Sequence, residues 1–342
     1  MLKNRLFAVL PIIMIMLSGC TDKNDSSFYS KDVFAMDTFM TIKAYGENAQ
    51  TAADLAEKEI MRLDSLLSVN APESDISRIN NSSNGAVVSA DTIKIMQKAA
   101  EISKKTEGAL DITVYPILSE WGFTTGKYSV PSKERISELL KNVDYKNVMI
   151  DEEKSTVYVP ENTYTELGSA AKGYTGDRVR DILKRNGVKS GIINLGGNVC
   201  AIGRKPDGSK WIVGIKDPDD TEKVICTVKA EDESVITSGN YERFFIGEDG
   251  HIYGHIIDTR TGYPVDDNGL LSVTIIGADG TMCDALSTAL FAMGKERALD
   301  FCRHESGFEA VFVGSDRKLY ITSGISRDVE PSENIDTEVI ER

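Results

Sequence analysis

The second half of the chain contains Ile192-Ile-Asn-Leu195, Trp211-Ile-Val-Gly-Ile215, Val224-Ile-Cys-Thr-Val228 and Leu270-Leu-Ser-Val-Thr-Ile-Ile276. Short apolar runs of this kind, separated by turn residues, are typical of β-strands. Further runs cover 241–246, 252–257, 310–313 and 319–322. Strands that follow one another without helices between them pair mainly antiparallel, so this half predicts a mostly antiparallel sheet.

Helical patterns are grouped elsewhere. Apolar residues form one stripe over 52–67, and we expect further helices over 92–106, after Ser132, over 170–185 and over 281–293. This grouping predicts an α+β fold, with helices packed on the sheet, in place of alternating βαβ units. We expect one domain over 31–330, followed by a polar tail over 331–342.

The composition is that of an ordinary globular protein, with 41% hydrophobic residues in 342 and a formal charge of -14. A surface this acidic repels nucleic acid, so nucleic-acid binding is not expected. A polyanionic ligand would need local cations. Four cysteines follow position 30 without C-x-x-C spacing, and we interpret them as small buried residues: Cys200, Cys226, Cys283 and Cys302.

The N-terminus has the features of an export signal. Lys3 and Arg5 precede an apolar run over 6–17, which is too short to span a bilayer comfortably. The run ends in Leu17-Ser-Gly-Cys20, which resembles a bacterial lipobox. We therefore predict a signal peptide over 1–19, lipidation of Cys20 and a polar tether over 20–30. The mature protein would lie outside the cytoplasm, anchored by acyl chains to a bacterial membrane, with the periplasmic side of the inner membrane preferred.

Asp284, Ser287 and Thr288 are spaced so that their oxygens share one face of a helix. One carboxylate with two hydroxyls suits Mg²⁺, a hard ion that prefers oxygen ligands. The alternative is a polar cluster whose hydroxyls bond back to helix carbonyls.

His255 is the histidine best placed for chemistry. It is followed by Asp258 and Arg260, and it suits proton transfer or contact with a phosphate. A zinc site shared with His251 fails, because four strand residues separate the two by about 13 Å. The alternative is a histidine of the core.

Glu166-Leu-Gly-Ser-Ala-Ala-Lys172 brings a carboxylate, small residues and a lysine to the start of a helix. Such a lysine is placed for a phosphate, although the stretch is not a Walker loop. Asp111 precedes Trp121-Gly-Phe123, which offers either an aromatic surface or a core turn.

Together these stretches resemble the ApbE family, the FAD:protein FMN transferases, over about 33–322. The matching motifs are Met36-Asp-Thr38, Ser74-Asp-Ile-Ser-Arg-Ile-Asn80, Gly108-Ala-Leu-Asp-Ile-Thr-Val114, Trp121-Gly-Phe123, Leu167-Gly-Ser-Ala-Ala-Lys-Gly-Tyr174, Asn194-Leu-Gly-Gly-Asn198, Thr237-Ser-Gly-Asn-Tyr-Glu-Arg243, His255-Ile-Ile-Asp258, Thr261-Gly-Tyr-Pro264 and Asp284-Ala-Leu-Ser-Thr288. The resemblance implies the family's T-fold-related α+β architecture.

The resemblance also implies the site. It assigns the Mg²⁺ surroundings to Ser169 (through its carbonyl), Asp284, Ser287 and Thr288. It assigns the FAD lining to Met36, Ala109, Leu110, Asp111, Glu166, Lys172 and His255. Two positions depart from the family pattern. Ser287 stands where many members have aspartate, so its coordination would be indirect. Asn70 stands where many have an aromatic residue, so the flavin would lose a stacking surface and water could reach the phosphate.

The function implied is Mg²⁺-dependent transfer of FMN from FAD to a threonine of an exported acceptor, with release of AMP. Asp284 would hold the metal and His255 would accept the threonine proton. The family's acceptors are flavoprotein subunits of ion-pumping redox complexes (Nqr or Rnf type). Two alternatives stay open: hydrolysis of FAD to FMN and AMP at the same site, and a lipid-anchored flavin-binding protein without turnover.

Overall fold

The computed structural model describes residues 28–342. The predicted signal peptide, Cys20 and the tether up to residue 27 lie outside the described residues. Within the described part, no helix is both long and apolar enough to cross a membrane.

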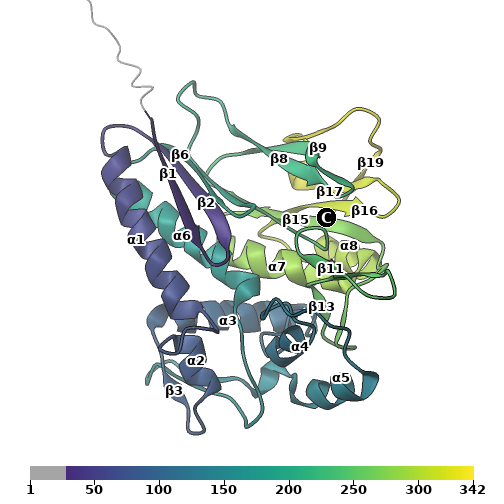
Figure 1. Cartoon of the computed structure of the whole chain (residues 1–342). Coiled ribbons are helices and arrows are strands. Elements are labelled where there is room, and N and C mark those ends of the chain that lie inside the picture. Colours follow the sequence, from purple (N-terminus) through teal and green to yellow (C-terminus); the bar gives the residue numbers. More distant parts are fainter. Residues whose placement is uncertain (1–27) are drawn as a thin grey trace, which may run out of the picture.

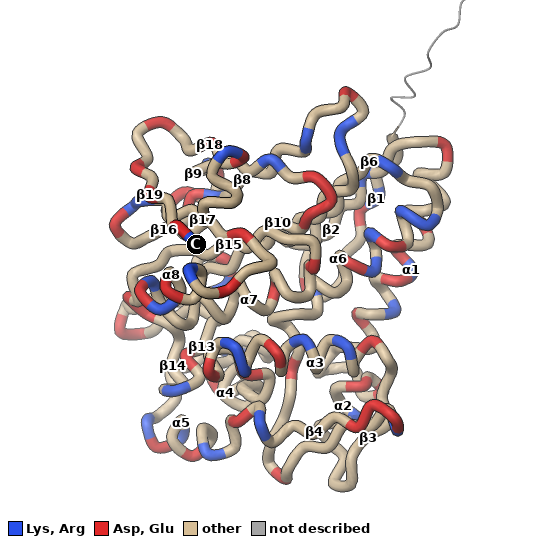
Figure 2. The backbone as a smooth tube through the Cα atoms, turned by 180° about the vertical axis from the view of Figure 1, so that it is seen from behind, with Lys and Arg blue, Asp and Glu red and all other residues tan. Residues whose placement is uncertain are grey.

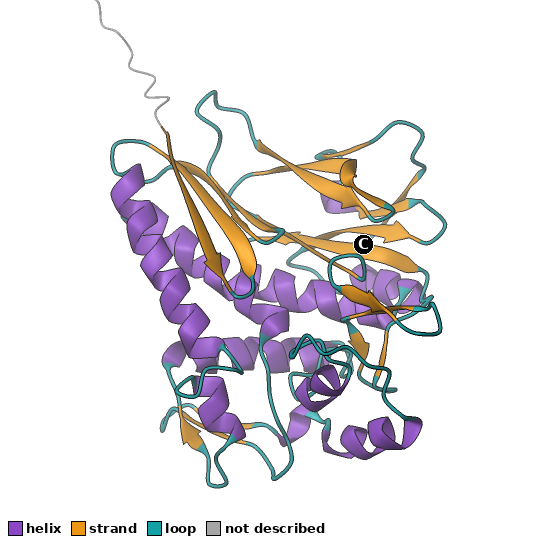
Figure 3. Cartoon of the chain, viewed as in Figure 1, coloured by secondary structure: helices purple, strands orange, loops and turns teal. Residues whose placement is uncertain are grey.

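A nine-stranded sheet forms the centre of the molecule (Figures 1 and 3). Neighbouring strands pair antiparallel, except for the parallel pair β17–β19. The order across the sheet is β1 (Phe28–Ala35), β2 (Thr38–Tyr45), β6 (Ser190–Leu195), β7 (Asn198–Ile202), β10 (Ser234–Gly239), β15 (Leu270–Gly277), β16 (Glu309–Gly314), β17 (Leu319–Thr322) and β19 (Thr337–Ile340).

Three long helices cover one face of this sheet: α1 (Ala49–Leu67), α6 (Gly168–Arg185) and α7 (Gly280–Met293). The alternation along β2 explains the contact, because Met40, Ile42 and Ala44 are buried against the apolar stripe of α1. A second sheet of β8 (Trp211–Asp217), β9 (Asp220–Ala230) and β18 (Val329–Pro331) packs on the other face.

The remaining elements gather mostly below the helical layer in Figure 1. The helices are α2 (Asp75–Asn80), α3 (Ala90–Lys105), α4 (Tyr115–Glu120), α5 (Lys133–Leu139) and α8 (Lys295–His304), with short 3-10 turns at Leu140–Asn142, Tyr145–Asn147 and Ser323–Ile325. The small sheets are β3 (Ala86–Val87) with β5 (Thr156–Tyr158) and β4 (Met149–Asp151), β11 (Phe244–Ile246) with β12 (Ile252–Gly254), and β13 (Ile257–Asp258) with β14 (Tyr263–Pro264).

The α+β architecture with a mostly antiparallel sheet is confirmed, but several boundaries differ. Residues 28–45 form a hairpin, because Met36 and Asp37 adopt left-handed backbone angles and turn the chain between β1 and β2. β1 already begins at Phe28, inside the expected tether. The expected tail contributes an edge strand, since Thr337–Ile340 pairs with β17 and buries Ile340. The four cysteines are free and buried, as predicted.

Candidate active site

The carboxylate of Asp284 lies where α6 and α7 cross. Its Oδ2 accepts a hydrogen bond from the backbone N–H of Gly173 at 2.8 Å. A Cβ atom at position 173 would lie 2.1 Å from the carbonyl oxygen of Gly280 and 2.7 Å from Cβ of Asp284. Glycine therefore lets the helices approach so closely that a carboxylate on one reaches the backbone of the other.

Asp177, one turn further along α6, fixes the start of α7. Its carboxylate accepts hydrogen bonds from the N–H groups of Gly280 and Thr281 and from the Thr281 hydroxyl, each at 2.9 Å. These bonds satisfy N–H groups that a helix leaves unpaired in its first turn. A carboxylate of α6 thus binds N–H groups of α7, and a carboxylate of α7 binds an N–H group of α6. Together these bonds set the position of α7 on α6.

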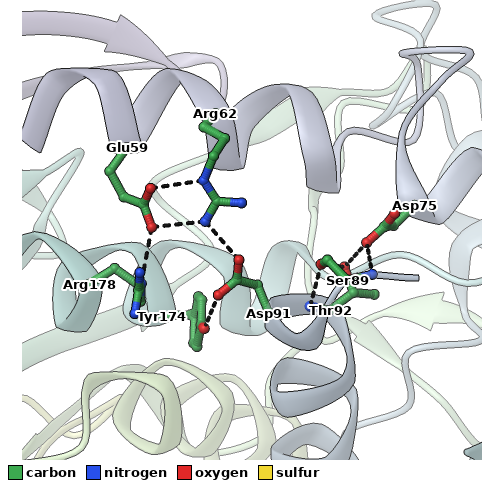
Figure 4. A network of polar contacts seen from close by, with 8 residues as sticks. All are labelled: Glu59, Arg62, Asp75, Ser89, Asp91, Thr92, Tyr174 and Arg178. Carbon is green, nitrogen blue, oxygen red and sulfur yellow. Dashed lines mark hydrogen bonds and ion pairs between the residues drawn. The ribbon is translucent and has the colours of Figure 1, made fainter. Parts of the chain in front are cut away.

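A polar network holds the same part of α6 against α1 and α3 (Figure 4). The Tyr174 hydroxyl donates to Asp91 at 2.5 Å, and Arg62 donates to the other carboxylate oxygen at 2.7 Å. Glu59 accepts from Arg62 at 2.8 Å and from Arg178 at 3.0 Å. Because Tyr174 follows Lys172 and Gly173, the network also positions those two residues.

Further charged groups surround Asp284. Burial raises the pKa of Asp284, Glu166 and Glu242, and the positive charge of Lys172 opposes the increase in all three. Asp284 is buried, Glu166 is half-buried and Glu242 is exposed, so three carboxyl groups at different depths surround one lysine. Such a place favours the binding of a cation.

His255 lies at the end of β12, and its ring orientation is fixed. Nδ1 is 3.1 Å from the carbonyl oxygen of Arg243. A carbonyl oxygen only accepts, so Nδ1 carries the hydrogen and Nε2 has the free lone pair. Burial lowers the pKa of His255 to about 4, and the charges of Lys172 and Arg243 act in the same direction. The imidazole is therefore neutral at pH 7.

The aromatic residues near this histidine belong to the core. Trp121 is fully buried and Phe123 nearly so, and Trp121 donates from Nε1 to the carbonyl oxygen of Gly262 at 2.9 Å. The Arg243 guanidinium donates to the carbonyl oxygen of Phe123. The two rings support the segment that carries Arg243 and His255. Trp121-Gly-Phe123 is therefore a turn in the core and not an exposed aromatic surface.

The loop after α3 reaches the start of α6. Asp111 is buried and accepts hydrogen bonds from the N–H groups of Thr113 and Tyr145, both at 2.8 Å, while burial raises its pKa. Ala109 is half-buried and Leu110 is buried beside it. The Glu166 N–H donates to the carbonyl oxygen of Ile112 at 2.9 Å, so this loop lies against the Glu166 segment.

Met36 contacts the helix that carries Lys172, whereas Asn70 lies in an exposed loop. The Met36 sulfur accepts a hydrogen bond from the Thr175 hydroxyl on α6 at 3.7 Å, which brings the β1–β2 turn to the same helix as Lys172. Asn70 is exposed in the loop after α1, where its N–H bonds to the Ser68 hydroxyl. Among the described residues, no hydrogen bond or ion pair joins its side chain to the charged group.

The oxygen donors near Asp284 fit a hard cation in part. The Thr288 hydroxyl is held only by long contacts of 3.3 Å, to Ser238 and to the Asp284 carbonyl. A regular helix pairs the Gly173 N–H with the Ser169 carbonyl, so the bond to Asp284 leaves that carbonyl acceptor capacity. Ser287 fits less well, because it is fully buried and its hydroxyl bonds to Ser238 at 2.8 Å and to Asp284 at 2.9 Å.

Asp284, Thr288 and the Ser169 carbonyl are therefore the residues suited to Mg²⁺. The described residues contain no group of three or more His, Cys, Asp or Glu side chains arranged for a metal ion. A magnesium site here would depend on hydroxyl, carbonyl and phosphate oxygens besides the single carboxylate.

Sequence reasoning missed Ser238, Glu242 and Asp177. Ser238 and Glu242 lie within Thr237-Ser-Gly-Asn-Tyr-Glu-Arg243, a stretch that contributed only to the family resemblance. Asp177 lies four residues after Gly173, so the helical spacing that grouped Asp284 with Thr288 could have grouped these two as well.

Comparison with known proteins identifies the class. The fold aligns with an ApbE protein of Thermotoga maritima at a TM-score of 0.82 and 34% identity, covering 88% of this chain and 99% of that one. It aligns with the flavin transferase ApbE of Vibrio cholerae at a TM-score of 0.79 and 26% identity, covering 88% and 100%. The central sheet with its layer of helices is thus the fold of these ApbE proteins.

The sequence matches the ApbE family over residues 36–312, and the chain belongs to that family. It is 33% identical to an FAD:protein FMN transferase of Klebsiella pneumoniae over 304 residues, covering 88% of this chain and 93% of the relative. It is 29% identical to an enzyme of the same name from Treponema pallidum, covering 93% of both.

Proposed function

We propose that this protein transfers FMN from FAD to a threonine hydroxyl of an exported acceptor protein, releasing AMP. The observation that carries the proposal is that the charge of Lys172, next to the Gly173–Asp284 contact of α6 and α7, acts on both Asp284 and a neutral His255. Membership of the ApbE family and the transferase names of its relatives support it.

The reaction exchanges one P–O bond for another. The threonine Oγ forms a bond to the phosphorus of the FMN half of FAD, and the bond from that phosphorus to the bridging oxygen breaks. The electron pair stays with AMP. The proton leaves the threonine hydroxyl for a base, so a base must lie beside the acceptor.

His255 is the base in this proposal. The hydrogen bond from Nδ1 to the Arg243 carbonyl leaves Nε2 unprotonated and keeps the ring from turning. The low pKa keeps His255 neutral above about pH 4 in the free enzyme. A bound diphosphate would counter the charges of Lys172 and Arg243 and raise the basicity of His255 when the substrate is present.

Lys172 and the residues suited to Mg²⁺ act on the diphosphate. Lys172 supplies a fixed positive charge for its oxygens. Mg²⁺ would be held by Asp284, Thr288 and the Ser169 carbonyl, and it would stabilise the charge that develops on the leaving group. A cation would stabilise the ionised form of the three neighbouring carboxyl groups, whose pKa values are raised without one.

The acceptors we propose are exported proteins, such as flavoprotein subunits of ion-pumping redox complexes. The predicted signal peptide and lipidated Cys20 would hold the enzyme on the extracytoplasmic side of the membrane, where it would meet them. Both features are sequence predictions from residues outside the described part of the structure.

Release of AMP from FAD tests the proposal. The purified protein is incubated with FAD, in Mg²⁺ or in EDTA, with and without a threonine-bearing acceptor domain. We expect AMP and a covalently bound fluorescent flavin only with both Mg²⁺ and acceptor. AMP without acceptor would identify a hydrolase and direct attention to Asn70. FAD binding without AMP under all conditions would leave a passive flavin-binding protein.

A further inference from the structure

One edge of the central sheet collects the ends of four strands. Phe28 pairs with Tyr45, and Tyr45 pairs with Ser190, while Gly191 pairs with Ile202. The start of β1, the end of β2, the start of β6 and the end of β7 therefore lie in one row. The chain enters the described structure in this row, at Phe28 (Figure 1).

Basic residues are concentrated at this edge. Residues 182–205 contain Lys184, Arg185, Lys189, Arg204 and Lys205 and no aspartate or glutamate, although the whole chain carries a charge of -14. Lys184 and Arg185 end α6, Lys189 precedes β6, and Arg204 and Lys205 follow β7. The back view shows blue segments beside β6 and in the loops above it (Figure 2).

Some basic side chains at this edge form ion pairs and others do not. Lys184 pairs with Asp232 at 2.6 Å and Arg204 with Glu231 at 2.8 Å. Among the described residues, Lys43, Lys189 and Lys205 have no ion-pair partner. Lys43 lies over the exposed ring of Phe28, 4.1 Å from its centroid.

We name Phe28, Lys43, Lys189, Arg204 and Lys205 the basic edge. We propose that the basic edge faces the anionic headgroups of the membrane that carries the lipid anchor, and so orients the enzyme on it. An exposed aromatic ring beside lysines suits the interface between headgroups and acyl chains. The proposal rests on the proposed anchoring at Cys20.

The reach of the tether supports this occupant. Seven residues, 21–27, separate Cys20 from Phe28. A chain of seven residues spans at most about 25 Å. An acyl anchor would therefore keep the basic edge close to the headgroups. The effective concentration is then high enough for a few lysines to bias the orientation.

Quenching of two fluorescent probes by headgroup spin-labelled lipids tests the orientation. The full-length lipidated protein is reconstituted in phosphatidylcholine vesicles, with or without phosphatidylglycerol. One probe is attached at Glu47→Cys, in the exposed turn beside the basic edge, and the control probe at Glu134→Cys on α5, at the opposite end of the molecule in Figure 1. The four native cysteines of the described residues are buried, and Cys20 would carry the lipid.

We expect several-fold stronger quenching at position 47 than at 134, and only with phosphatidylglycerol. The double variant Lys189→Glu, Lys205→Glu should remove this difference in quenching while the protein stays bound to the vesicles. Lys133→Glu with Lys141→Glu, the matched change at the far end, should leave it intact. Equal quenching of both probes, or a difference that survives the first reversal, would overturn the proposed orientation.

Two further readouts separate this proposal from those on which it rests. Full-length protein that does not float with neutral vesicles would refute the anchoring and the orientation with it. Transfer of FMN to a soluble acceptor domain should be unchanged in both charge-reversed variants. Loss of that transfer in the basic-edge variant alone would show that the basic edge serves the active site and would overturn the proposed membrane role.

Discussion

The Gly173 backbone N–H and the Asp284 carboxylate, 111 positions apart in sequence, meet in a hydrogen bond of 2.8 Å. The bond joins the second turn of α6 to the second turn of α7. It ties the proposed metal carboxylate to the helix that carries Lys172. Changes at either residue should therefore act on the site and on the packing of the two helices.

Gly173→Ala should damage both. The new methyl group would collide with the Gly280 carbonyl at 2.1 Å, and overpacking of this kind costs about 1–3 kcal/mol. We expect a lower urea midpoint together with loss of FAD-dependent AMP release. Gly176→Ala is the matched control, because its methyl group would meet Leu195 at an ordinary 3.6 Å. Equal effects of both variants would contradict the inference that the close approach of α6 and α7 requires glycine at position 173.

His255→Ala should keep FAD binding and lose most turnover. Removal of a general base costs about 10²–10⁴ in rate, and the ring makes no hydrogen bond that holds α6 to α7. The measurement is kcat for FMN transfer beside the FAD dissociation constant from flavin fluorescence. The exposed His304→Ala serves as control. Full turnover in the first variant would exclude His255 from the chemistry.

Asp284→Asn should lower activity by roughly 10²–10³-fold, the cost typical of removing one electrostatic contact to a transition state. Asparagine can still accept the Gly173 hydrogen bond, so the thermal midpoint should change little.

Thr288→Val should raise the Mg²⁺ concentration needed for half-maximal rate more than Ser287→Ala does, because the Ser287 hydroxyl already makes two hydrogen bonds within the protein. A larger increase in the Ser287→Ala variant would indicate that Ser287, and not Thr288, contacts the metal.

Stability should depend on pH through His255. The unfolded imidazole has a pKa near 6.5, while the folded one is lowered to about 4. Between these values the unfolded state binds more protons, so this contribution is fully present above about pH 6.5 and is lost as pH falls toward 4. Relative to His255→Gln, the wild-type protein should lose free energy of unfolding across that window. Urea titrations at pH 7, 5.5 and 4.5 measure it, and a constant difference would contradict the low pKa.

The spacing of Asp284, Ser287 and Thr288 predicted a shared helix face, but not which oxygens are available. Local periodicity does not reveal that the Ser287 hydroxyl is hydrogen-bonded to Ser238 of β10. The expected strand 241–246 is shortened to β11 by a turn over 241–243, and the expected strand 252–257 is divided between β12 and the start of β13. The edge strand at Thr337–Ile340 was missed because only its last residue is buried. The helix at 52–67 was predicted from its apolar stripe, and the central strands were predicted from short apolar runs, because strands such as β15 are buried on both faces.

β1 runs without interruption from Phe28 to Ala35, and Met36 follows it directly into the turn beside α6. A strand of this length spans about 24 Å and bends little when paired along its whole length. Whatever fixes the distance of Phe28 from the membrane therefore also fixes the height of the Met36 turn, beside the proposed active site. With the proposed function and orientation, acceptors whose threonine reaches that height would be modified, and acceptors whose threonine lies at the bilayer surface would not.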